Sequence, residues 1–215
     1  MADFYNISEF IKSYDNEAPC GLWNLRREAE RNGVPIIREE MENFIRVMLN
    51  LKKPKRILEL GTAIGYSAIY MAMNMPKDCH IDTIENYDKR IVSAKANIKA
   101  YGMEDRITLY EGDCAEVLLT LKDKYDFIFM DAAKAQYMTY LKLCMKLMNP
   151  GAMMLTDNIL CDMCILQSKF VVERRDRTIH ERMREYLHAL THSDELDTSL
   201  IPLGDGVALS IRKDD

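Results

Sequence analysis

Oxygen-bearing side chains stand at the ends of two predicted strands of this chain. Asp131 follows the apolar run 125–130, and Asp157 and Asn158 follow the apolar run 152–156. If both runs are parallel strands, their carboxyl ends meet at one edge of a sheet, where the two carboxylates and the amide lie close together. Such oxygen donors, without a neighbouring histidine or thiolate, suit a hard divalent cation such as Mg²⁺. The alternative is that each aspartate caps a following helix.

A third strand ends in a turn of small residues. The segment ILELGTAIGYS, residues 57–67, gives a buried strand with an acid at Glu59, a turn over Gly61–Gly65, and then an apolar helix. The turn departs from a pyrophosphate fingerprint, because its third and sixth positions are Ala63 and Tyr66. Small residues at the first, third and fifth positions instead resemble motif I of the class I S-adenosylmethionine (SAM)-dependent methyltransferases.

The next predicted strand also ends in an acid. Residues 80–84 are apolar enough to form a strand and lead to Glu85, which is 26 positions after Glu59. An acid at this place is suited to accept hydrogen bonds from a ribose diol. The alternative is that Glu85 caps a helix that begins near Asp88.

Composition limits the architecture and the class of partner. The 215 residues fit a single domain, residues 1–215, in which a helical preface occupies residues 1–50. No apolar run is long enough to span a bilayer, and the first ten residues lack a signal pattern, so we expect no membrane partner. Six cysteines scattered through predicted core elements indicate reduced thiols and a cytoplasmic protein. A net charge of −5 argues against nucleic-acid binding through a wholly basic surface but leaves room for a local basic patch.

The element pattern predicts an α/β fold, a Rossmann-like doubly wound sheet with helices on both faces. Three helices form an N-terminal extension, at Ile7–Tyr14, Trp23–Arg31 and Arg38–Asn50. Strands then alternate with helices, which implies a mostly parallel sheet. The predicted parallel strands are Arg56–Leu60, His80–Ile84, Ile107–Tyr110, Tyr125–Met130 and Ala152–Thr156. Leu196–Pro202 and Val207–Arg212 form a C-terminal antiparallel hairpin.

Four motifs together carry a family resemblance over residues 34–213. ILELGTAIGYS, IFMDAAKAQY, LTDNIL and IPLGDGVALS resemble, in order and spacing, the cation-dependent O-methyltransferases that act on catechol and caffeoyl-coenzyme A. Within that family the chain is similar to the bacterial tRNA 5-hydroxyuridine methyltransferases, on the evidence of VPI at 34–36, GTAIGYSAI, DAAK-x-QY and the GDG turn. One departure is visible. The catechol enzymes have histidine and tryptophan where this chain has Ala132 and Ala133.

The resemblance implies a role for individual positions. The SAM-binding residues would be Ile37 (through its backbone), Glu59, Gly61, Ser67, Glu85, Asp113, Cys114 and Asp131. The Mg²⁺ ligands would be Asp131, Asp157 and Asn158. Lys134 matches the catalytic lysine, which would accept the proton of the substrate hydroxyl. Its alternative role is that of a charge partner for Asp131 or a solvated helix residue.

The methyl acceptor is predicted from the subgroup resemblance and a basic segment. Residues 169–184 hold six basic side chains, and an RNA loop would be held through phosphate contacts to five of them, Arg174, Arg175, Arg177, Arg182 and Arg184. The resemblance implies methylation of the 5-hydroxyl of the wobble uridine in a tRNA anticodon loop, by a homodimer. Two alternatives stay open. The basic segment can be a solvated, salt-bridged helix, and the acceptor can be a small catechol-type phenol.

Overall fold

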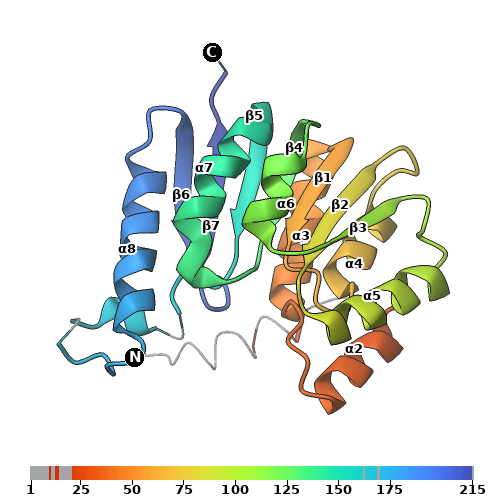
Figure 1. Cartoon of the computed structure of the whole chain (residues 1–215), viewed down its shortest axis with the longest axis horizontal. Helices are drawn as coiled ribbons and strands as arrows, with labels where there is room; N and C mark the ends of the chain where they lie inside the picture. Colours follow the sequence, from red (N-terminus) through yellow and green to blue (C-terminus); the bar gives the residue numbers. More distant parts are fainter. Residues whose placement is uncertain (1–9, 11–12, 15–20, 162, 169, 215) are drawn as a thin grey trace.

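A seven-stranded sheet forms the centre of the computed structural model, which describes residues 10, 13–14, 21–161, 163–168 and 170–214. The strand order is β3-β2-β1-β4-β5-β7-β6 (Figure 1). The strands are β1 (Arg56–Leu60), β2 (His80–Glu85), β3 (Ile107–Glu111), β4 (Tyr125–Met130), β5 (Met148–Thr156), β6 (Leu196–Ile201) and β7 (Val207–Arg212). β1 to β5 are parallel, and β7 runs antiparallel to both β5 and β6.

The register of the parallel strands aligns their ends. Met130 of β4 lies opposite Leu60 of β1 on one side and Thr156 of β5 on the other. The residues that follow these three, Gly61, Asp131 and Asp157, therefore leave the sheet at the same level. Figure 1 shows these ends at the lower edge of the sheet, close to the turn between β6 and β7.

Helices cover both faces of the sheet, and each face has its own apolar core. The helices are α2 (Trp23–Arg31), α3 (Glu39–Lys52), α4 (Tyr66–Asn74), α5 (Asp88–Ala100), α6 (Cys114–Thr120), α7 (Tyr137–Leu147) and α8 (Arg177–Thr191), with short 3-10 turns η1 (Lys134–Gln136) and η2 (Cys164–Leu166). Successive side chains of β4 alternate between the cores, as a strand requires. Phe127 and Phe129 pack with α2, α3 and α4, whereas Ile128 and Met130 pack with α6, α7 and α8.

The predicted fold class is confirmed, with corrections at element ends. β5 begins at Met148, four residues before the predicted Ala152. The basic segment is not helical from its start, because α8 begins only at Arg177. The predicted helix Ile7–Tyr14 lies largely outside the described residues. Among the residues that are described, no helix combines the length and apolar character needed to cross a membrane.

A buried ion pair joins the helices α2 and α3 of the N-terminal extension, and Tyr66 links this pair to α4. Arg26 of α2 is 8% exposed and pairs with the carboxylate of Glu42, which is 4% exposed. The same guanidinium donates to the carbonyl of Ile37 over 2.9 Å, and the Tyr66 hydroxyl donates to Glu42 over 2.6 Å. The cluster therefore fixes α2, α3 and α4 against one another through a single pair of charges.

Removing Arg26 should destabilise the protein severely, because Glu42 would be left as an uncompensated buried charge. We expect Arg26→Ala to lower the free energy of unfolding by about 3–5 kcal/mol, measured by urea denaturation. Arg27→Ala, an exposed change on the same helix, is the matched control and should cost no more than about 0.5 kcal/mol. Equal losses for the two variants would show that the buried pair is not the anchor of α2.

Candidate functional site

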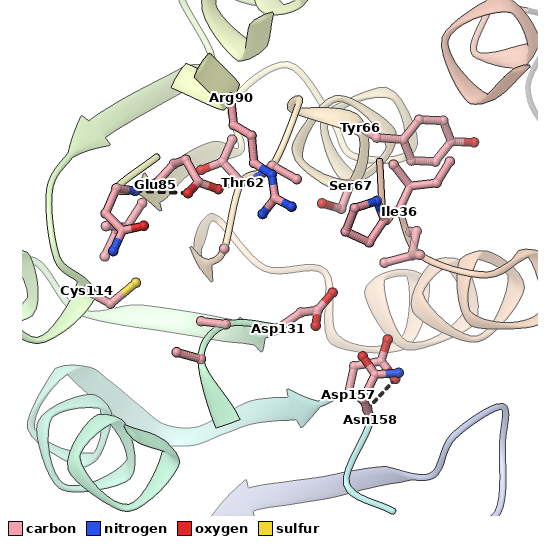
Figure 2. Close-up of a pocket in the computed structure, with 18 of the residues that line it drawn as sticks. Ile36, Thr62, Tyr66, Ser67, Glu85, Arg90, Cys114, Asp131, Asp157 and Asn158 are labelled. Carbon is pink, nitrogen blue, oxygen red and sulfur yellow. Dashed lines mark hydrogen bonds between the residues drawn. The ribbon is translucent and has the colours of Figure 1, made fainter. Parts of the chain in front are cut away.

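A cavity of about 540 Å³ opens at the carboxyl edge of the parallel strands (Figure 2). Its walls come from residues 35–38, the turn after β1, the start of α4, and the ends of β2, β4 and β5. Eight of the residues predicted to bind cofactor or metal line it, namely Ile37, Gly61, Ser67, Glu85, Cys114, Asp131, Asp157 and Asn158. Three predicted residues, Glu59, Asp113 and Lys134, lie outside the lining.

Gly61 allows the ends of β1 and β4 to approach each other closely. Its φ is +97°, and a Cβ added there would overlap the carbonyl oxygen of Asp131. Any side chain at position 61 would therefore push apart the backbones that form the floor of the cavity. Gly65, with φ +84°, ends the turn and caps α4.

Glu85 supports the turn from the neighbouring strand. One of its carboxylate oxygens accepts the backbone N–H of Ala63 over 2.8 Å, and the other accepts those of Asn86 and Tyr87, each over 3.0 Å. The N-cap of α5 is Tyr87, without a side-chain capping bond. Glu85 thus binds the segment before α5 and the glycine turn together, and a contact with a ribose remains a prediction.

Glu59 lies behind the cavity wall, fully buried. Its Oε2 accepts the hydroxyl of Thr83 over 2.5 Å, while Oε1 has no hydrogen-bond partner within the part of the chain that the structure describes. Burial, helped by the charges of Asp131 and Glu85 and opposed by side-chain hydrogen bonds, raises the pKa of Glu59 to about 7. A cationic ligand in the cavity would lower the free-energy cost of the ionised Glu59 carboxylate. Direct contact of Glu59 with a cofactor remains a prediction.

Asp131, Asp157 and Asn158 point toward one another in Figure 2. Burial and, after it, the nearby charge of Asp131 together raise the pKa of Asp157 to about 7. Burial also raises the pKa of Asp131, against the opposing charges of Lys134 and Arg90. Asn158 has φ +55°, a left-handed conformation that asparagine tolerates better than most residues.

This donor set fits a divalent cation better than it fits helix capping. The 3-10 turn after Asp131 has Ala133 as its N-cap, and the next described helical turn after Asp157 begins only at Cys164, so the capping alternative is wrong for both aspartates. Within the described residues, no three His, Cys, Asp or Glu side chains are grouped to hold a metal ion. A bound cation would therefore need the Asn158 amide, and water or substrate oxygens, beside the two carboxylates.

The turn between β6 and β7 brings a third carboxylate to this region. Asp205 is 6% exposed, and its Oδ2 lies 3.8 Å from Nζ of Lys134. The backbone carbonyls of Asp205 and Gly206 accept the N–H groups of Leu160 and Ile159 over 2.9 and 3.1 Å. The turn therefore holds both the lysine and the loop that follows Asn158. Asp205 was not predicted as a site residue, although it is the central residue of the GDG turn.

Asp113 and Cys114 have different positions: Asp113 caps a helix, whereas Cys114 lines the cavity. Asp113 caps α6, accepting the N–H of Ala115 over 2.8 Å, and its predicted contact with adenine remains a prediction. Cys114 lines the cavity with Tyr140. Burial raises the pKa of the Cys114 thiol to about 12, so it is a neutral, apolar wall near pH 7.

The five predicted phosphate-binding arginines are exposed but are not equivalent. Arg175 pairs with Glu173 over 3.0 Å and with Asp176 over 3.6 Å, as the salt-bridged alternative predicted. Arg177 donates to the carbonyl of Val172 over 3.2 Å, and Arg182 donates to that of Ala135 over 2.9 Å. Arg174 lies in the turn before α8 and Arg184 lies on α8, and none of the five lines the cavity.

Comparison with known proteins decides the family. The sequence profile of the O-methyltransferase family matches residues 12–213. The chain belongs to this O-methyltransferase family. A catechol O-methyltransferase from Niastella koreensis is 28% identical, with 98% of each chain aligned.

Solved structures of similar proteins agree with the family match. A Staphylococcus aureus protein, provisionally described as a caffeoyl-CoA O-methyltransferase, is 31% identical and has a TM-score of 0.86, over 97% of this chain and 98% of its own. An O-methyltransferase from Streptomyces achromogenes, solved in complex with SAM, has a TM-score of 0.83 over 97% and 96% of the two chains. At 21% identity, the second likeness shows the fold alone.

Proposed function

We propose that this O-methyltransferase uses SAM and a divalent cation to methylate the 5-hydroxyl of 5-hydroxyuridine at the wobble position of tRNA. The observation that carries the proposal is the pair of carboxylates Asp131 and Asp157, which line the cavity beside the Asn158 amide. The family match supports O-methyl transfer, and the SAM in the Streptomyces achromogenes structure supports the choice of cofactor.

The residues of the cavity fit SAM by shape and by charge. The absence of a side chain at Gly61 keeps the cavity open beside the Asp131 backbone, and the raised pKa values of Glu59 and Asp157 indicate carboxylates that an added positive charge would stabilise. SAM supplies a methyl group on a positively charged sulfur. In the proposed arrangement, Glu85 accepts the ribose hydroxyls, and Ser67 and the backbone near Gly61 and Ile37 hold the methionine part.

The methyl transfer is a direct displacement on carbon. The hydroxyl oxygen of the substrate forms a bond to the methyl carbon, the carbon–sulfur bond breaks, and its electron pair stays on sulfur. A divalent cation held by Asp131, Asp157 and Asn158 would stabilise the substrate oxyanion. Lys134 would take up the hydroxyl proton at Nζ, and Asp205 at 3.8 Å would stabilise the ammonium that results.

Two features support tRNA as the acceptor. Ala132 and Ala133 line the cavity where the catechol enzymes have larger side chains, which leaves room for a base with its ribose. Arg182 contacts the carbonyl of Ala135, one position after Lys134, so the exposed arginines of α8 adjoin the proposed catalytic group. An anticodon loop that presents an unstacked uridine to the cavity would place its phosphates near these arginines.

A small phenol is the second candidate acceptor. It is favoured by the printed names of the relatives, which include a catechol O-methyltransferase and a provisionally described caffeoyl-CoA O-methyltransferase. A catechol panel therefore accompanies hydroxyuridine-containing tRNA in each activity assay. The acceptor with the higher kcat/KM decides between the two candidates, and turnover of neither would overturn both.

The cation site can be tested with a variant that keeps its shape. Asp157→Asn removes one negative charge from the donor set, so we expect kcat to fall roughly 100-fold or more, with the fold retained by circular dichroism. Asp105→Asn, in an exposed turn, is the charge-matched control and should keep full activity. Full activity of the wild type in excess chelator would contradict the metal-dependent reaction.

The RNA-binding role can be tested on Arg174 and Arg184, the two of the five predicted arginines for which the described structure gives no hydrogen bond or ion pair. The double variant Arg174→Gln/Arg184→Gln should raise the KM for tRNA and lower the slope of log KM against log salt by about 1.5, because each phosphate contact contributes roughly 0.7–0.9. Turnover of free 5-hydroxyuridine should not change. Arg31→Gln, exposed on α2, is the control. An unchanged salt slope in the double variant would favour the small-phenol acceptor.

A further inference from the structure

Arg90 is a cation in the cavity to which neither the family resemblance nor the comparisons assign a role. It lies in the first turn of α5 and lines the same cavity as Ser67 and Glu85. Figure 2 shows its guanidinium pointing into the cavity, as does the Ser67 hydroxyl. Its side chain also passes over the ring of Tyr87, with Cζ 5.7 Å from the ring centroid, a contact that helps to hold it in this direction.

The charges around the cavity are mostly negative. Glu85, Asp131 and Asp157 line it, whereas Arg38 and Arg90 are the two cations in the lining of the described structure. The positive charge of Arg38 opposes the rise in the pKa of Asp157, and the positive charge of Arg90 opposes the rise in the pKa of Asp131. A ligand that carries a carboxylate into this cavity is repelled by three acids, so it needs a cation at the place where its own carboxylate lies.

The start of α4 offers one side of a site for that carboxylate. The helix begins at Tyr66, after Gly65, and no acidic residue lies in its first turn. Its free N–H groups and its dipole favour an anion, and Ser67 adds a hydroxyl that is 7% exposed. Arg90 reaches the same cavity from α5 and supplies a full positive charge.

We propose that Arg90 binds the carboxylate of the methionine part of SAM, opposite Ser67 and the start of α4. This inference rests on the proposed use of SAM. A guanidinium can form two parallel hydrogen bonds with a carboxylate, which fixes direction as well as charge. Arg90 is therefore a cofactor-binding residue that orients the amino-acid end of SAM, while the adenosine end is held independently of it.

Two ligands that differ in the amino-acid end test the inference. S-adenosylhomocysteine has the carboxylate, and 5′-methylthioadenosine lacks the whole amino-acid part. By calorimetric titration, Arg90→Gln should bind S-adenosylhomocysteine about 10- to 100-fold more weakly, as expected for a hydrogen bond between charged groups, and 5′-methylthioadenosine as well as the wild type does. Lys89→Gln, an exposed neighbour outside the lining, should bind both ligands normally.

The outcomes separate this inference from the proposed function. If the wild type binds neither ligand, the use of SAM is wrong. If Arg90→Gln loses affinity for both ligands equally, or for neither, the carboxylate contact is wrong while the use of SAM stands. A raised KM for the methyl acceptor with unchanged S-adenosylhomocysteine binding would assign Arg90 to the substrate and overturn the inference. Arg90→Lys, which keeps the charge, provides the same ligand comparison if the glutamine variant does not fold, and should retain part of the affinity.

Discussion

The burial of Asp157 beside a second carboxylate, that of Asp131, at the carboxyl edge of the sheet is the constraint on which the site depends. The parallel register sets Asp131 and Asp157 on neighbouring strand ends, and the two apolar cores keep those strands together. As a consequence, burial and the charge of Asp131 raise the pKa of Asp157 to about 7. The fold thus maintains an arrangement that is unfavourable without a compensating positive charge, and the proposed cation would relieve it.

The backbone around the two carboxylates also helps to hold them in place. Gly61 lets β1 and β4 approach, Asn158 takes a left-handed conformation directly after Asp157, and the Asp205-Gly206 turn fixes the loop that follows. The Arg26–Glu42 pair fixes the wall of the cavity that comes from the N-terminal part of the chain, because Arg26 also donates a hydrogen bond to the carbonyl of Ile37 in that wall. The residues proposed to hold the cofactor and the cation therefore lie on backbone segments that are hydrogen-bonded to one another.

Much of this site could be predicted from local sequence, because a strand with an acid at its end is a local pattern. Alternating apolar strands and helices predicted the parallel sheet, and parallel order alone brings Asp131 and Asp157 to one edge. Asp205 could not be assigned in this way. Its contact with Lys134 depends on β7 pairing antiparallel with β5. Lys134 and Asp205 are far apart in the sequence, and no local pattern predicts that they meet. Arg90 was missed for the same reason, since its position on a helix says nothing of the cavity beneath.

The ends and partners of surface elements were predicted least well. α8 begins at Arg177, so the charged residues before it form turns, and Arg175 pairs with Glu173 and Asp176. Charge spacing alone cannot distinguish such local pairs from groups available to a phosphate, because both need exposed arginines. The longer β5 reflects pairing at Tyr125–Met148, beyond a register shift that no apolar pattern reveals.

Proton release on cation binding is the measurement that tests the central claim most directly. The pKa of Asp157 is raised to about 7, so at pH 6 most of the protein carries a protonated carboxyl group there, which a bound cation must deprotonate. Calorimetric titration of the metal-free protein with Mn²⁺, in buffers of different ionisation enthalpy, should show release of close to one proton per cation at pH 6, with less release and tighter binding at pH 8. Absence of Mn²⁺ binding at both pH values, or binding without any proton release, would contradict the account.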